Sequence, residues 1–137
     1  MLERDKHKSA NEWYKTYAIN KGRKIFEIQD TFEIKPWYNN TNFNNFETRT
    51  LNRLMAGHDY SKYWLNKMNI EDDQNCETCN EPENAEHIIL NCSKFSAIRS
   101  KFSFDGKFNN ITELLKSKNT YVLKDLVTYL KQIQAKL

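Results

Sequence analysis

The chain has 137 residues, of which 39% are hydrophobic, and it contains only three glycines and two prolines. This length fits one domain with a modest core, and the scarcity of glycine and proline favours uninterrupted helices. No stretch approaches the roughly 20 apolar residues that cross a bilayer, and the charged first residues lack a signal-peptide core. We therefore expect an intracellular protein, in the nucleus or the cytoplasm, that makes no membrane contact.

The first half of the chain is predicted to contain helices and one extended segment. Aromatic residues at helical spacing indicate a helix over residues 11–20. Alternating apolar residues indicate an extended segment, with one or two short β-strands, over residues 24–34. A firmer helix is expected over residues 42–55, with Phe46 on its apolar stripe and Gly57 at its end.

The second half of the chain is predicted to be helical apart from short loops. Five helices are expected here. Three begin after the capping residues Asp59, Asn84 and Ser93, and the other two cover residues 111–116 and 119–136. The last of these carries a continuous apolar stripe. The whole pattern predicts a mainly α fold, with a linker-like part over 1–40 and a helical domain over 41–137 that together form one compact unit.

The charge of the chain is unevenly distributed. Residues 1–70 hold twelve basic and eight acidic side chains, a net charge of +4, and residues 93–137 hold nine and three, a net charge of +6. Residues 71–92 hold seven acidic side chains and no basic one. A nucleic acid would be repelled by this acidic block, so any surface for it is expected on the two flanks.

The three cysteines all lie in the acidic block, at positions 76, 79 and 92. An odd number of cysteines in a chain without a secretory signal argues against a disulfide framework. Together with His87 they form the pattern Cys-x2-Cys-x7-His-x4-Cys.

This spacing is typical of a zinc site. Two cysteines three residues apart can present both sulfurs from one tight turn, and a following helix can bring His87 and Cys92 to the same ion. Four protein ligands leave no open coordination position, so we expect one structural Zn²⁺ in a zinc knuckle. The alternative is that the cysteines are small buried apolar groups and that His87 is an ordinary surface or core histidine.

Two segments resemble the C-terminal tail of non-LTR (LINE-type) retrotransposon reverse transcriptase polyproteins. The sequence RTLNRLMAGH at residues 49–58 is similar to the family signature R…L.RLRTGH, and EHIILNC at residues 86–92 is similar to its EHLLxxC. The resemblance covers roughly residues 11–102. It implies a zinc-binding tail, located after the reverse transcriptase and RNase H regions, that helps to hold template RNA or target DNA. Met55-Ala56 stands where the family more often has Arg-Thr.

Several side chains are candidates for contacts with RNA or single-stranded DNA. The candidates are basic residues on the flanks and two aromatic residues in a predicted loop: Arg49, Arg53, Lys62, Lys67, Lys94, Arg99, Lys101, Trp37 and Tyr38. We expect Lys94, Arg99 and Lys101 to project outward from one helix. The alternative is that these residues are ordinary surface charge and that most aromatic residues belong to the core.

The sequence contains no recognisable catalytic set, so we expect no enzyme activity and no small-molecule substrate. His58 could be a ligand, a base or a switch, but its place after Gly57 favours a capping or packing role. The second hypothesis for the function is a standalone, domesticated protein-interaction module. It would use the acidic zinc segment and the 119–136 helix, either for a protein partner or for self-association.

Overall fold

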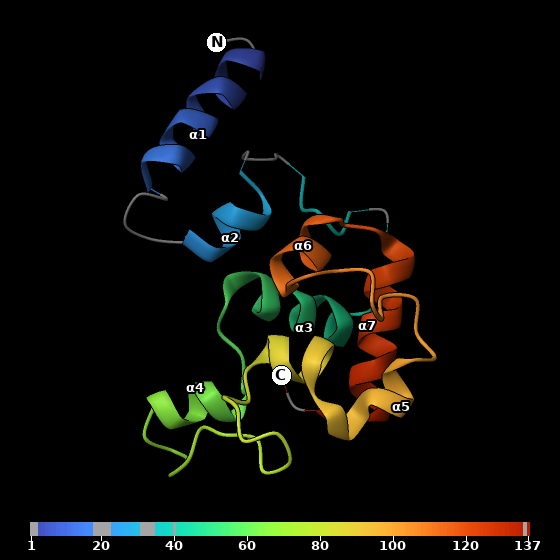
Figure 1. The fold of residues 1–137 in the computed structure, drawn as a ribbon. Coiled ribbons are helices and arrows are strands. Elements are labelled where there is room, and N and C mark those ends of the chain that lie inside the picture. Colours follow the sequence, from blue (N-terminus) through green and yellow to red (C-terminus); the bar gives the residue numbers. More distant parts are fainter. Residues whose placement is uncertain (1–2, 18–22, 31–34, 40, 136) are drawn as a thin grey trace.

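The computed structural model describes residues 3–17, 23–30, 35–39, 41–135 and 137. The described part is mainly helical, as predicted, and helix α1 projects from the remainder of the chain (Figure 1). The elements are α1 (Glu3–Tyr17), α2 (Arg23–Ile28), α3 (Asn45–Ala56), α4 (Lys62–Lys67), η1 (His87–Asn91), η2 (Ser93–Phe95), α5 (Ser96–Arg99), α6 (Ile111–Lys116) and α7 (Thr120–Gln132). None of the helices in these ranges has the length and apolar character that a membrane crossing requires.

Helix α3 has defined signals at both ends. The side chain of Asn44 accepts a hydrogen bond from the backbone N–H of Glu47, and the Glu47 carboxylate accepts one from the backbone N–H of Asn44. This reciprocal capping box satisfies two backbone donors that the helix leaves unpaired. Gly57 ends the helix in the left-handed conformation, with φ of 75°. The predicted helix is therefore confirmed, with its start moved to Asn45.

Helices α3 and α7 supply much of the hydrophobic core. Leu51, Leu54 and Met55 of α3 are buried together with apolar side chains of η1, α6 and α7. The apolar stripe of α7 faces inward, and its buried members are Val122, Leu123, Leu126, Val127 and Leu130. In this fold the stripe is therefore not available to a partner, which corrects the expectation that it serves as a docking face.

The extended segment predicted over 24–34 is wrong over residues 24–28, which belong to helix α2. Ile25 and Ile28 are three residues apart, so a helix places both on one side, where they pack against the core. The alternation of apolar residues here resembles a strand only because the pattern is short. Residues 31–34 lie outside the described residues. The helix predicted over 11–20 is confirmed over 11–17 as part of α1, which includes residues back to Glu3, and residues 18–20 lie outside the described residues.

Two other helix starts differ from the prediction. Helix α4 follows Ser61, and the Asp59 carboxylate instead accepts a hydrogen bond from the backbone N–H of Ser61, directly before the helix. The helix expected to be capped by Ser93 is a short 3₁₀ turn followed by α5, which ends at Arg99. The later aromatic Phe102 packs against Phe104 and Tyr129.

Candidate metal centre

Cys76 and Cys79 lie on a tight hairpin turn. The backbone N–H of Cys76 donates to the carbonyl of Glu81 at 2.7 Å, and the N–H of Asn80 donates to the carbonyl of Cys76 at 2.8 Å. Asn80 adopts the left-handed conformation, with φ of 55°, which asparagine tolerates better than most residues. The hairpin thus presents both sulfurs to the same side, as the spacing predicts.

His87 and Cys92 are brought together by one wide helical turn. The side chain of Asn84 accepts a hydrogen bond from the backbone N–H of His87 at 2.8 Å, which confirms Asn84 as the predicted cap. The chain then forms the π-turn η1, in which the N–H of Cys92 donates to the carbonyl of His87 at 2.6 Å. In an α-helix, residues five apart lie about 140° apart around the axis. The wider π-turn brings them closer to one side.

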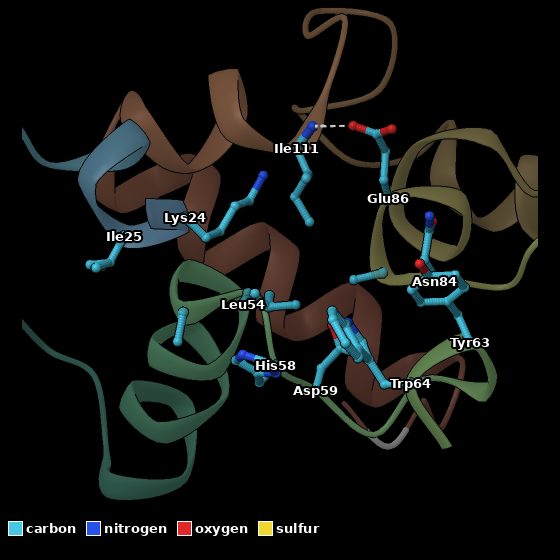
Figure 2. A pocket seen from close by; sticks show the side chains of 13 residues that line it. Lys24, Ile25, Leu54, His58, Asp59, Tyr63, Trp64, Asn84, Glu86 and Ile111 are labelled. Atoms are coloured by element: carbon cyan, nitrogen blue, oxygen red, sulfur yellow. Dashed lines mark hydrogen bonds between the residues drawn. The ribbon is translucent and has the colours of Figure 1, made fainter. Parts of the chain in front are cut away.

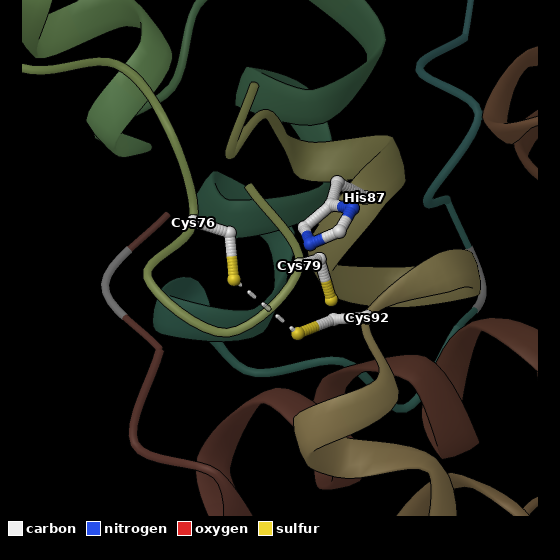
Figure 3. A group of neighbouring side chains, drawn as sticks. All are labelled: Cys76, Cys79, His87 and Cys92. Atoms are coloured by element: carbon white, nitrogen blue, oxygen red, sulfur yellow. Dashed lines mark hydrogen bonds between the residues drawn. The ribbon is translucent and has the colours of Figure 1, made fainter. Parts of the chain in front are cut away.

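The predicted ligand set comes together. One ligand atom from each of Cys76, Cys79, His87 and Cys92 lies within 4.8 Å of the other three (Figure 3). The three cysteines are free, and the sulfurs of Cys76 and Cys92 are 3.8 Å apart. Tetrahedral zinc with Zn–S bonds of about 2.3 Å requires sulfurs about 3.8 Å apart. The spacing of this pair is therefore suited to a metal ion.

His87 supplies a second indication of a metal site. Its imidazole is buried, with 4% of the residue exposed, and Nε2 has no hydrogen-bond partner among the described residues. A buried polar atom without a partner is costly, and a cation beside it would remove that cost. The other ring nitrogen, Nδ1, lies 3.6 Å from Oε2 of Glu81. This distance is too long for a hydrogen bond, so the Glu81 carboxylate acts on the imidazole through its negative charge.

The sulfurs differ in their electrostatic surroundings. The hydroxyl and the backbone N–H of Ser93 approach the sulfur of Cys79 at 3.2 and 3.5 Å, and these hydrogen bonds lower the pKa of the Cys79 thiol. Burial raises the pKa of the Cys92 thiol to about 11, against the opposing hydrogen bond from the backbone N–H of Lys94. A bound cation reverses the cost of burial, because metal coordination deprotonates a thiol.

Three features of the centre were missed in the sequence. The π-turn between His87 and Cys92, the contact of Glu81 with His87 and the hydrogen bonds from Ser93 to Cys79 all depend on the folded chain. The five-residue separation of His87 and Cys92 is a signal for the turn, because one α-helical turn would place them apart. For the hydrogen bonds from Ser93 to Cys79, the position of Ser93 directly after the last cysteine is a weaker sequence signal.

The candidate nucleic-acid residues are distributed over several elements. Those with exposed side chains are Arg49, Lys67, Lys94, Lys101 and Tyr38. Lys62 is half-buried and is bound to the hairpin, because its ammonium donates to the carbonyl of Asn75 at 2.8 Å. Trp37 is also half-buried, and its indole N–H donates to the side chain of Asn52 at 2.7 Å.

Arg99 does not project outward, which corrects the expectation for this residue. It is 5% exposed, and its Nε lies 3.4 Å from Oδ1 of Asp105. The side chain lies in the interior instead, where it also interacts electrostatically with Tyr129. A buried guanidinium already beside a carboxylate is not free to hold a phosphate.

A pocket of about 650 Å³, separate from the cysteine cluster, lies between α2, α4, α6 and the residues around Gly57 (Figure 2). Two of its charged side chains are already engaged: the Lys24 ammonium donates to the Thr112 hydroxyl, and the Glu86 carboxylate accepts from the backbone N–H of Ile111. His58 lines the pocket with its ring 4.8 Å from the ring of Trp64. This contact supports the packing role expected for His58.

Comparison of the chain with protein-family models, with curated proteins and with solved structures finds no match. The resemblance of residues 49–92 to retrotransposon tails stays a prediction. What the geometry supplies is a closed set of three sulfurs and one imidazole that is suited to a metal ion.

Proposed function

We propose that this chain is a non-catalytic module that is held together by one structural Zn²⁺ and that binds RNA or single-stranded DNA through basic side chains outside the metal centre. The observation that carries the proposal is the convergence of four ligand atoms within 4.8 Å, one of them on a buried imidazole. Three thiolates and one imidazole are the ligands that structural zinc prefers, and they fill its tetrahedral shell.

The proposed role of the metal is structural. Zinc would join the hairpin that carries Cys76 and Cys79 to the turn that carries His87 and Cys92. Ile88 and Ile89 of that turn are buried in the core with residues of α3 and α7. Zinc binding therefore contributes to folding free energy, and it fixes the two helices relative to the hairpin.

The distribution of charge supports the proposal for nucleic acid. The acidic side chains around the centre, among them Glu71, Asp72 and Glu77, are exposed and would repel phosphate. The exposed basic side chains belong to the flanking segments. Within this proposal, the resemblance to a retrotransposon reverse transcriptase tail indicates the origin of the module, and a strand of RNA or DNA is its ligand.

The zinc proposal is tested by native mass spectrometry and metal analysis of the purified chain. We expect one zinc per chain, and we expect Cys79→Ser to lower both zinc content and melting temperature. Glu77→Gln is the matched control, because it changes an exposed residue of the same hairpin without removing a ligand. A Cys79→Ser variant with the zinc content and stability of the wild type would contradict the proposal.

Binding of nucleic acid is tested separately by fluorescence anisotropy with labelled single-stranded RNA and DNA at several salt concentrations. We expect log K to fall linearly as log salt rises, because each phosphate contact releases counterions. Zinc-loaded protein that binds neither strand at low salt would contradict this part of the proposal and leave the metal centre untouched.

A protein-interaction module is the second candidate function, and one observation favours it. Met68 and Ile70 are exposed apolar side chains directly before the acidic residues 71–73. Exposed apolar groups beside acids fit a partner with a basic, partly apolar surface. This function would be favoured over the first by two results together: the wild type binds no RNA, and it forms a stable complex with a protein partner that the Ile70→Ser variant does not form.

A further inference from the structure

A face formed by α3, α7 and the loop after α3 carries two exposed aromatic rings. Phe46 is 53% exposed and Tyr60 is 52% exposed, although both types of ring are usually buried. The ammonium of Lys131 lies 5.8 Å from the centroid of the Phe46 ring, and the guanidinium carbon of Arg53 lies 4.9 Å from that of Tyr60. We call this surface the α3–α7 face.

A hollow of about 160 Å³ lies between these two ring–cation pairs. Both rings and both cations line it, and Val127, Leu130 and Leu137 contribute apolar surface. The Arg53 guanidinium already donates a hydrogen bond to the carbonyl of Leu137 at 3.3 Å. The hydroxyl of Thr50, which also lines the hollow, already donates to the carbonyl of Phe46. The hollow therefore offers flat rings, cations and apolar side chains rather than a set of directional polar contacts.

The charge of the α3–α7 face is positive. Helices α3 and α7 contain four basic residues, Arg49, Arg53, Lys124 and Lys131, and two acidic ones, Glu47 and Asp125. Both acids are engaged within the fold: Glu47 is buried and pairs with Lys124, and the carboxylate of Asp125 accepts hydrogen bonds from Ser103. An anionic occupant is attracted to such a face, whereas a second copy of it is repelled.

Rings, cations and an apolar hollow together suit one class of ligand. Unpaired nucleobases stack on aromatic rings and on guanidinium planes whatever their sequence, while nearby cations hold the backbone phosphates. A paired base in a duplex keeps both faces covered by its neighbours. The ligand that fits is therefore a single strand rather than a double helix.

We propose that the α3–α7 face is a stacking site for unpaired bases, in which Phe46 and Tyr60 receive bases while Lys131 and Arg49 hold the phosphates. Arg49 is exposed and lies about one helical turn after Phe46 on α3. This inference rests on the proposed nucleic-acid function and names the site that serves it. It also assigns the stacking role to residues other than Trp37 and Tyr38.

The test is fluorescence anisotropy of the zinc-loaded full chain with a labelled oligonucleotide of about 12 uridines, and with an RNA duplex of the same length. The variants are Phe46→Leu and Tyr60→Leu, which remove a ring and keep apolar bulk. The control is Tyr121→Leu, because Tyr121 lies on α7, is 85% exposed and does not line the hollow. Melting temperatures and zinc content are compared, so that a folding defect is recognised.

We expect Phe46→Leu and Tyr60→Leu each to weaken single-strand binding about tenfold or more, with the salt dependence unchanged, and Tyr121→Leu to have no effect beyond about twofold. Arg49→Gln should reduce the salt slope by about 0.7, since it removes one phosphate contact. Weaker binding of the duplex than of the single strand supports the inference.

Several results would overturn the inference. If the wild type binds the single strand and both leucine variants bind equally well, the stacking site is wrong and the proposed function stands. Equal affinity of the wild type for the duplex and the single strand would likewise contradict the stacking site alone. If the wild type binds no RNA, the proposed function itself fails; if it dimerises and the leucine variants do not, the face is a self-association surface instead.

Discussion

The hydroxyl of Tyr129 donates a 2.6 Å hydrogen bond to the backbone carbonyl of Ile88, and this bond joins helix α7 to the turn that begins at His87. Tyr129 is fully buried, and burial raises the pKa of its phenol, against the opposing effect of Arg99. The phenol therefore stays neutral and can donate. The bond connects the turn that carries His87 directly to helix α7 of the core.

Removal of this hydroxyl should destabilise the fold. Tyr129→Phe leaves the carbonyl of Ile88 buried without its partner, and we expect a loss of about 1–3 kcal/mol in the free energy of unfolding. Urea unfolding measures it. Tyr121→Phe removes the same hydroxyl from an exposed ring of the same helix and should change stability by less than about 0.5 kcal/mol. Equal effects of the two substitutions would show that the bond contributes little.

The contact of Glu81 with His87 should affect metal affinity more than folding. Glu81→Gln removes the negative charge that lies 3.6 Å from Nδ1 of His87. We expect zinc affinity to fall about two- to fivefold, because the carboxylate is mostly exposed and acts on His87 through its charge alone. Competition with a chelator of known affinity measures it. Glu77→Gln removes an exposed acid of the same hairpin. A similar loss of zinc affinity in that variant would mean that the negative charge of the hairpin matters, and not the contact of Glu81 with His87.

Gly57 is required both for its backbone conformation and for space. Its φ is 75°, and a Cβ at this position would lie 2.8 Å from Cγ of Lys24 in α2. Gly106 has a similar φ of 72° with no atom within 4 Å of an added Cβ. Gly106→Ala should thus cost about 1–2 kcal/mol for conformation alone. Gly57→Ala should cost more in urea unfolding, and equal costs would mean that Lys24 moves aside freely.

The ion pair of Glu47 and Lys124 should make the free energy of unfolding depend on pH in the acidic range. Burial opposes the charge of Glu47, which is 2% exposed, but hydrogen bonds from Lys124 and from the backbone N–H of Asn44 outweigh it and place the pKa below its ordinary value of 4.5. Because the folded pKa is the lower one, the stabilisation is complete above pH 4.5 and is lost as the pH falls through the folded pKa.

Comparison of the wild type with Glu47→Gln isolates this effect, since acid release of the metal affects both proteins. We expect Glu47→Gln to be less stable by about 1–3 kcal/mol at neutral pH, with a difference that shrinks below pH 4.5. Urea unfolding at a series of pH values measures it. A difference that stays constant from neutral pH to pH 3 would mean that the charge of Glu47 is not what stabilises the fold.

Local interactions account for what the sequence by itself determined. The end of α3 at Gly57 and the bounds of α6 follow from contacts within four residues along the chain, and such contacts can be recognised in the sequence. The residues of the candidate metal centre were also predicted from the sequence, by their spacing. The π-turn that brings His87 and Cys92 toward one side depends on the folded chain.

Tertiary structure decided which side chains are buried, because burial depends on which face of each helix packs against the rest of the fold. Residues 24–28 became a helix because Ile25 and Ile28 pack against the core, and Arg99 is buried beside Tyr129 and Asp105. Phe46, predicted on the apolar stripe of its helix, is exposed, whereas Glu47 beside it is buried with Lys124 as its partner. Burial is set by residues far away in the chain, so periodicity alone does not reveal it.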